Sequence, residues 1–210
     1  DSGFYRDNSL EHLASRDSKL VEMDKKHVDF TMYYQSETAI ERFPLEQQLW
    51  LLQYEFDEEA IAKTSIRGGN AGIFLPIWHY GLVTGFQIRQ FNKQPKYLTY
   101  AQTKFSHLHA NADMLIITED LMSSYKLRLV GHSTLALLGT TLHDEVVDLI
   151  LKLKYKKVVV WLDDDVAGHR GMKDIINYLR PVVKNVSAVD LAQPKELSFS
   201  FLSSLNFEGT

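Results

Sequence analysis

The sequence predicts an α/β fold in which a parallel sheet flanked by helices follows a smaller mixed α+β segment with a basic character. Between residues 113 and 189, short apolar runs alternate with segments of helical period, which is typical of a parallel sheet with helices on its faces. Residues 73–89 instead form two apolar runs around a tight turn, which is typical of an antiparallel hairpin. The chain is long enough for one good core or two small ones.

The first elements are predicted to be helical. Residues 1–36 are polar and lack a period, which indicates a linker with room for one short helix. The segment 43–62 is expected to be helical, with Pro44 in a first turn and the acids 57–59 opening a second short helix. The apolar residues of this segment recur at spacings of three and four: Leu45, Leu49, Leu52 and Phe56.

A glycine-rich segment and a hairpin follow. Residues 67–72 predict a turn or mobile loop, because they contain three glycines and an asparagine. Ile73–Pro76 and Leu82–Arg89 are predicted strands around a turn. In the second strand the mostly apolar face should point to the core, which leaves Gln87 and Arg89 on the other face.

The second half is predicted to alternate strands with helices. The predicted strands are 114–118, 129–133, 158–162 and 182–189, and the predicted helices follow the first strand through about 126 and span about 143–154 and 167–180. Residues 199–210 resemble the start of a helix or linker. His107 and His109 could form a metal pair, but without nearby acids we expect them to be polar surface.

Acidic side chains follow two of these strands. Asp163, Asp164 and Asp165 come directly after the buried strand 158–162, and Glu119 directly follows the strand 114–118. Ligands of open α/β sheets bind at the carboxyl ends of the strands, where these acids can converge. Because side chains alternate along an extended chain, Asp163 and Asp165 can point to one side and Asp164 away.

Carboxylates that close together repel one another unless a cation shares them, and oxygen ligands suit Mg²⁺ or Mn²⁺. The sequence therefore predicts a divalent metal site at this edge of the sheet. The alternative is a helix N-terminus with acidic caps, a position where aspartate is favoured.

Composition excludes several classes of protein. The net charge is −4, and the absence of cysteine excludes disulfides and cysteine-based sites and fits an intracellular protein. No apolar run is long enough to span a membrane and no secretory signal is visible. The chain opens with Asp1 rather than methionine, which suggests an excised fragment.

Charge is unevenly distributed along the chain. Residues 1–62 hold 14 acidic and 6 basic residues, whereas residues 63–112 hold no Asp or Glu. The basic residues of this window are Lys63, Arg67, Arg89, Lys93, Lys96 and Lys104. Local positive charge of this kind indicates a polyanion partner. The alternative is an uncharged, β-rich segment with no such partner.

The motifs together resemble a known family. Ile116-Ile117-Thr118-Glu119, then Gly139-Thr140 before a helix, then Asp163-Asp164-Asp165-Val166-Ala167-Gly168 resemble the Toprim domain of DnaG-type primases, bacteriophage primase–helicases, topoisomerases and some nucleases. The order within residues 73–105, a strand and hairpin with Gly85-Phe86-Gln87-Ile88-Arg89 and then Pro95-Lys96-Tyr97, resembles the basic subdomain that precedes Toprim in DnaG-type and phage primases. No cysteine-rich zinc module of the kind that primases carry upstream is visible.

The resemblance implies a function and an arrangement of domains. The chain would be the RNA-polymerase core of a DNA primase, a nucleotidyltransferase that makes short RNA primers from NTPs on single-stranded DNA. Residues 1–42 would be a linker, 43–110 the basic subdomain, 111–197 the Toprim domain, and 198–210 the start of a C-terminal linker or helix. Such a protein would act in the cytoplasm or nucleoid of a bacterial host, beside a fused or separate replicative helicase and without a membrane.

The resemblance also implies roles for individual residues. Asp163 and Asp165 would bind Mg²⁺ or Mn²⁺, and Glu119 would be a further ligand or the general base. Arg89 and Lys96 would contact nucleotide phosphates or the template. The remaining candidates for binding NTP are Arg67, His169 and Arg170.

Two positions depart from the family pattern. Ser123 and Gln193 stand where the family has acids that help to bind metal. Asp120, Asp164 or Glu196 could compensate. These departures keep two alternatives open, a Toprim nuclease and a catalytically degenerate Toprim domain that only binds nucleic acid.

Overall fold

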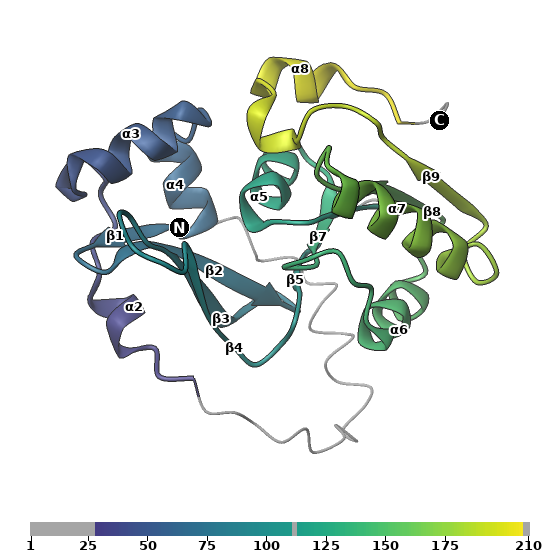
Figure 1. Ribbon diagram of the computed structural model, residues 1–210, viewed down its shortest axis with the longest axis horizontal. Coiled ribbons are helices and arrows are strands. Elements are labelled where there is room, and N and C mark those ends of the chain that lie inside the picture. Colours follow the sequence, from purple (N-terminus) through teal and green to yellow (C-terminus); the bar gives the residue numbers. More distant parts are fainter. Residues whose placement is uncertain (1–27, 111–112, 208–210) are drawn as a thin grey trace. The chain divides into compact units, whose positions relative to one another are not determined.

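The structure is a computed structural model that describes residues 28–110 and 113–207 (Figure 1). Most of the predicted N-terminal linker and the last three residues lie outside the described residues. The chain divides into two compact units: the first includes Asp57–Thr103 and the chain up to Gln48, and the second includes Leu49–Phe56 and the chain from Lys104 onward. Each unit contains one sheet, an antiparallel one of four strands and a mixed one of five.

The sheet of the first unit confirms the predicted hairpin. Its strands pair antiparallel in chain order: β1 (Arg67–Gly69), β2 (Gly72–His79), β3 (Leu82–Arg89) and β4 (Tyr97–Ala101). The β2–β3 turn places Tyr80 and Gly81 at φ 50° and 75°, and two positive φ values suit the twist of a two-residue hairpin. Phe86 and Ile88 of β3 are buried and pack with Tyr33 and Phe74, as the predicted core face requires.

The prediction of a loop at residues 67–72 is wrong for its first half, because Arg67–Gly69 forms β1. The glycine there serves packing rather than a turn. A Cβ at Gly68 would overlap the ring of Phe43, so the missing side chain lets that ring lie against the strand.

From residue 28 to the start of β1, the structure describes four short helices: α2 (Thr31–Gln35), η1 (Ile40–Arg42), α3 (Leu45–Gln53) and α4 (Glu58–Thr64). The predicted second helix is confirmed, and Asp57 caps α4 by accepting the backbone N–H of Ala60 at 2.9 Å. The three predicted leucines of α3 are exposed, and Gln47 and Leu51 are buried instead. The spacing therefore predicted the helix but not its packed face.

The sheet of the second unit has the order β5-β7-β6-β8-β9. Four strands are parallel, β7 (Ser133–Ala136), β6 (Met114–Thr118), β8 (Lys157–Trp161) and β9 (Asn185–Ala188), and β5 (Ser106–Leu108) pairs antiparallel with β7. The predicted strand at 129–133 is wrong, because α5 (Leu121–Leu129) ends at its first residue, a turn follows, and only Ser133 belongs to a strand. Gly131, at φ 100°, ends that helix and moves the strand to Ser133.

Helices cover both faces of this sheet, as predicted for an α/β unit. Alternate residues of β6 and β8 face opposite ways, so Ile117 and Val160 pack against α6 (Asp144–Leu153) and α7 (Val166–Leu179). Ile116 and Val159 pack in a second cluster with residues of α5 and α8 (Phe199–Ser204). Figure 1 shows α6 and α7 together on one side of this unit. The strand ends are thereby left for the loops that carry the acids.

Among the described helices, none combines the length and apolar character needed to cross a membrane.

Candidate metal centre

The strand ends of β6 and β8 bring the predicted acids together. The two strands are parallel neighbours with Thr118 opposite Trp161, so Glu119 and Asp163 leave the sheet at the same edge. The backbone N–H of Asp163 donates to the carboxylate of Glu119. The structure thus places side by side two residues that are 44 positions apart in the sequence.

Both carboxylates lie in an environment that disfavours their charge. Burial raises the pKa of Glu119, and the neighbouring charges of Asp163, Asp165 and Asp120 raise it further. Burial likewise raises the pKa of Asp163; the ammonium of Lys195 opposes this effect, and Asp120, Asp165 and Glu196 add to it. Three further carboxylates, those of Asp120, Asp165 and Glu196, therefore act on Glu119, on Asp163 or on both at this edge.

One oxygen of the cluster fits a cation ligand. Oε2 of Glu119 is buried and has no hydrogen-bond partner within residues 28–110 and 113–207. A buried carboxylate oxygen without a donor is costly, and a hard divalent cation is the partner that such an oxygen takes in proteins. The residues present therefore fit a divalent ion held by Glu119 and Asp163.

Asp165 caps a helix and also lies among the acids of the proposed metal site, the two roles that the sequence left open. It is the N-cap of α7, and its Oδ1 accepts the backbone N–H of Gly168 at 2.7 Å. Its charge nevertheless acts on both Glu119 and Asp163. Asp164, between the two, has an exposed side chain, and Asp165 is exposed as well, so burial does not separate the two and the alternation stays a prediction.

Asp120 is occupied by contacts within the protein. Its Oδ1 accepts the backbone N–H groups of Met122 and Ser123 at 2.9 and 3.1 Å, which caps α5. Its Oδ2 accepts the Ser123 hydroxyl at 2.8 Å and lies 3.2 Å from Nζ of Lys195. Ser123 is buried, so it serves as a support for Asp120 rather than as a weakened metal ligand. The geometry does not favour Asp120 as a metal ligand.

The predicted nucleotide contacts after Gly168 lie on the exposed side of α7. Nδ1 of His169 lies 2.9 Å from the carbonyl oxygen of Asp165, and Nε2 lies 3.5 and 3.6 Å from carboxylate oxygens of Asp164 and Asp190. Arg170 instead lines a cavity of about 690 Å³ together with Thr140, which belongs to the predicted turn before α6. The two residues thus face different neighbours.

The first unit brings Arg89 and Lys96 together. They line a cavity of about 320 Å³ with Asn92, Lys93 and Gln94, and none of these residues is acidic. The guanidinium of Arg89 donates to the carbonyl oxygen of Gln90 and lies over the rings of Phe91 and Tyr97, at 5.1 and 5.3 Å. Cations next to aromatic faces are suited to hold a phosphate and a base.

Arg67 has a structural role that its sequence position did not indicate. Its guanidinium lies 4.7 Å from the ring centre of Tyr33 and donates to the carbonyl oxygen of Tyr34 at 3.2 Å. It does not line the cavity that Arg89 and Lys96 share. The geometry does not favour Arg67 as a nucleotide contact.

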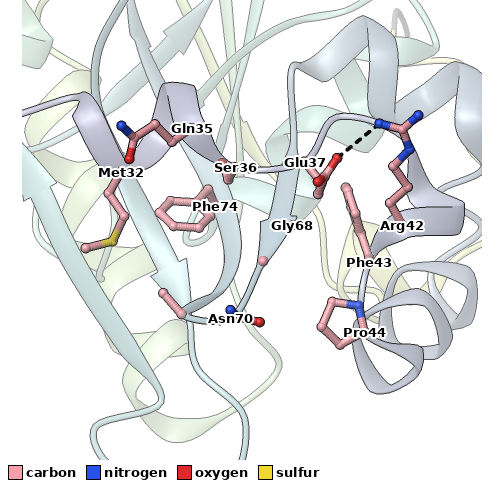
Figure 2. Close-up of a pocket in the computed structure, with 12 residues that line it drawn as sticks. Met32, Gln35, Ser36, Glu37, Arg42, Phe43, Pro44, Gly68, Asn70 and Phe74 are labelled. Atoms are coloured by element: carbon pink, nitrogen blue, oxygen red, sulfur yellow. Dashed lines mark ion pairs between the residues drawn. The ribbon is translucent and has the colours of Figure 1, made fainter.

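A larger cavity of about 610 Å³ lies in the first unit, near α2 and the start of β2. Figure 2 shows Phe43 and Phe74 beside it and the Glu37–Arg42 ion pair, 3.6 Å long, at one side. Its only cation is thus already paired, so this cavity has weaker anion-binding character than the smaller one at Arg89.

Sequence reasoning missed the buried polar residues of the second unit. The expectation that His107 is surface is wrong: it is buried in β5, and its Nε2 lies 2.9 Å from the hydroxyl of Tyr155, which His109 Nδ1 also contacts at 2.9 Å. Burial raises the pKa of Tyr155 to about 12. Lys126 is also buried, although it stands in a helix whose sequence shows little periodicity. No role for Lys195 was indicated by the sequence either. The nearby residues Gln193 and Glu196 were considered only because the family has a metal-binding acid in this region.

These features define a Toprim-like domain, and the comparisons with known proteins agree. Residues 117–197 match the Toprim-like family. No curated protein matches the sequence.

Solved structures that resemble this one include catalytic cores of DNA primases. A structure of the DnaG catalytic core matches 78% of this chain and 72% of its own at a TM-score of 0.62 and 17% identity. The DnaG primase catalytic domain bound to ssDNA matches 79% and 71% at a TM-score of 0.63 and 18% identity. The primase fragment of the bacteriophage T7 primase-helicase protein matches 89% and 79% at a TM-score of 0.57 and 13% identity. The chain therefore has the fold of a primase catalytic core.

Proposed function

We propose that this chain is the RNA-polymerase core of a DNA primase, which makes short RNA primers from NTPs on single-stranded DNA. The observation that carries the proposal is the meeting of Glu119 and Asp163 at one sheet edge, with a buried Glu119 oxygen that has no partner within the described residues. The fold of primase catalytic cores and the basic cavity at Arg89 support it.

Toprim domains typically bind divalent metal, and here Glu119, Asp163 and Asp165 would hold Mg²⁺ or Mn²⁺. The ion would neutralise phosphate charge and lower the pKa of the attacking hydroxyl. Glu119, whose pKa burial raises, is suited to accept the proton of that hydroxyl if it is not itself a ligand. Asp165 holds the first turn of α7 in place through its cap and so fixes the loop that carries Asp163.

The basic residues would bind the polyanions of the reaction. Arg89 and Lys96 line one cavity together with Lys93, where a phosphate of the template or of an NTP would be attracted. Arg170 and Thr140 line a second cavity, in the Toprim unit, that would accept part of an NTP. We assign residues 43–110 to the basic subdomain and 111–197 to the Toprim domain. The setting would be the bacterial cytoplasm or nucleoid, with a replicative helicase as partner.

Incubation of the protein with single-stranded DNA, the four NTPs and Mg²⁺ or Mn²⁺, followed by sizing of the products, tests the proposal. RNA products a few nucleotides long indicate a primase. Shortened DNA without RNA indicates the nuclease alternative. DNA binding without either product indicates a Toprim domain retained for binding alone.

A further inference from the structure

One cation lies inside the acidic edge. Nζ of Lys195 is 3.2 Å from Oδ2 of Asp120, and the side chains of this pair are only 18% and 28% exposed. The same ammonium is the charge that opposes the other influences on Asp163. Asp120 and Asp163 therefore share a fixed positive charge before any metal ion arrives.

The position of Lys195 is determined by buried groups rather than by its own flexible side chain. Lys195 belongs to the short turn η2 (Pro194–Glu196), whose first residue is buried. Nζ of Lys126, in α5, donates to the backbone carbonyl of Lys195 at 3.1 Å. Only 1% of the Lys126 side chain is exposed, and it is held by Glu55 at 3.6 Å and the Phe199 ring at 5.0 Å.

A second contact holds the preceding loop. The indole Nε1 of Trp161, two residues before Asp163, donates to the carbonyl oxygen of Ala192 at 3.2 Å. The chain that leads into η2 is thus tied to β8, the strand that carries the aspartates. The contacts made by Lys126 and Trp161 therefore fix the loop that places the ammonium of Lys195 at the acidic edge.

We propose that Lys195 is a built-in cation that takes the place of a second metal ion, so that the acidic edge binds a single divalent ion. The inference rests on the proposed metal centre. The carboxylate of Asp120 accepts from the ammonium of Lys195, from the Ser123 hydroxyl and from two backbone N–H groups of α5. Both of its oxygens therefore already have donors. A second divalent ion would have to displace this ammonium, and two cations so close together repel one another. Glu119 keeps the buried oxygen, without a partner within the described residues, that a first ion requires.

A purely structural ion pair is the competing explanation, and it makes a different prediction. If Lys195 only ties η2 to α5, its removal lowers the free energy of unfolding and leaves metal binding unchanged. If it substitutes for an ion, its removal creates a second site. The number of bound ions separates the two explanations, whereas activity alone does not.

Mn²⁺ bound to the full chain can be counted by titration with electron paramagnetic resonance of the free ion, in parallel with thermal unfolding of the apoprotein. We expect one Mn²⁺ for the wild type, two for Lys195→Gln, and one for Lys195→Arg, which keeps the charge. Lys184→Gln removes an exposed lysine just before β9, at the opposite end of that strand from Asp190, and serves as the matched control with one ion. Lys195→Gln with Asp120→Asn should return to one ion.

Each result is decisive. One ion for both the wild type and Lys195→Gln, or two ions for the wild type, overturns the inference while the proposed metal centre stands. No Mn²⁺ bound by any variant at millimolar concentration overturns the metal centre itself and the inference with it. If Lys195→Gln does not fold, two ions bound to Lys195→Arg still contradict the inference, because arginine retains the charge.

Discussion

At the scale of single residues, three consecutive aspartates differ in their surroundings. Asp163 is half-buried beside Glu119, Asp165 caps α7, and Asp164 is exposed on the loop between them. An isosteric change to asparagine removes the charge and keeps the cap, because asparagine caps helices as well as aspartate does. The three asparagine variants therefore isolate the charge at each position.

We expect Asp163→Asn and Asp165→Asn each to reduce primer synthesis at least about 100-fold, a loss of the order of 3 kcal/mol in transition-state stabilisation. Asp164→Asn should lower it less than about 5-fold, because its carboxylate is exposed to solvent. Initial rates at saturating Mg²⁺ test this, with thermal unfolding of each variant as the control for folding. If Asp164→Asn severely reduced primer synthesis and Asp163→Asn did not, Asp164 rather than Asp163 would be the proposed metal ligand.

Glu119 gives a prediction about pH. Burial and neighbouring carboxylates raise its pKa, so near its ordinary pKa and just above it the folded protein binds more protons than the unfolded chain. The free energy of unfolding therefore falls as the pH rises through this window, and the cost of the charge is fully present at neutral pH. Removing that charge should stabilise the apoprotein.

Glu119→Gln should raise the Tm of the apoprotein at pH 7.5 by about 2–4 °C, the shift that about 1 kcal/mol produces in a protein of this length. The difference from the wild type should shrink as the pH is lowered to 4.5, because the pKa of Glu119 is raised and protonation of its carboxyl removes the cost of the charge. Mg²⁺ should raise the Tm of the wild type more than that of Glu119→Gln, because the variant lacks one ligand. Thermal unfolding with and without Mg²⁺ at both pH values provides the measurements. A less stable variant at pH 7.5 would contradict the account.

At the scale of elements, the approach of α7 to β8 depends on a glycine. A Cβ at Gly168 would clash with the carbonyl oxygen of Asp163. Any side chain there must push α7 away from the loop that carries the aspartates. The glycine after the aspartates is therefore a packing requirement of the site.

Gly168→Ala should lower primer synthesis more than 10-fold and destabilise the fold by about 1–3 kcal/mol, which is typical of overpacking. Val166→Ala, at the exposed first position of α7, is the matched control and should change both quantities little. Urea unfolding and initial rates measure the two effects. Wild-type Mn²⁺ binding by Gly168→Ala would show that the loop tolerates the displacement and that the packing argument fails.

The elements also show how far the sequence could be interpreted. Continuous apolar runs before acids predicted β6 and β8 to within a residue, because a strand buried on both faces has no polar side chain to confuse the pattern. Residues 129–133 were predicted to be a strand, although Leu129 is the last residue of α5. Leucine occurs in helices as well as in strands, so its apolar character did not separate the two. The meeting of Glu119 with Asp163 followed from strand order. The position of Lys195 could not be predicted in this way. It depends on a hydrogen bond from the buried Lys126, which is far away in the sequence.

At the scale of the whole molecule, charge is separated along the chain. The net charge is −4, yet residues 63–112 contain no acid and six basic residues. The structure places Arg89, Lys93 and Lys96 around one cavity of the first unit. Acids gather instead at the sheet edge of the second unit. The proposed metal centre in one unit and the basic cavity in the other would suit a reaction that joins metal chemistry to a polyanionic template.

Single-stranded DNA should bind with an affinity that falls steeply with salt, because each neutralised phosphate releases a counterion. For Lys93→Gln and Lys96→Gln we expect weaker binding and a slope of log K against log salt that is smaller by about 0.7 for each lost phosphate contact. Lys184→Gln, which removes an equal charge from the second unit, should leave the slope unchanged. Fluorescence anisotropy of a labelled oligonucleotide between about 50 and 200 mM salt measures the slopes. An affinity that ignores salt over this range, or equal losses for Lys184→Gln and Lys96→Gln, would show that the cavity at Arg89 is not the template contact.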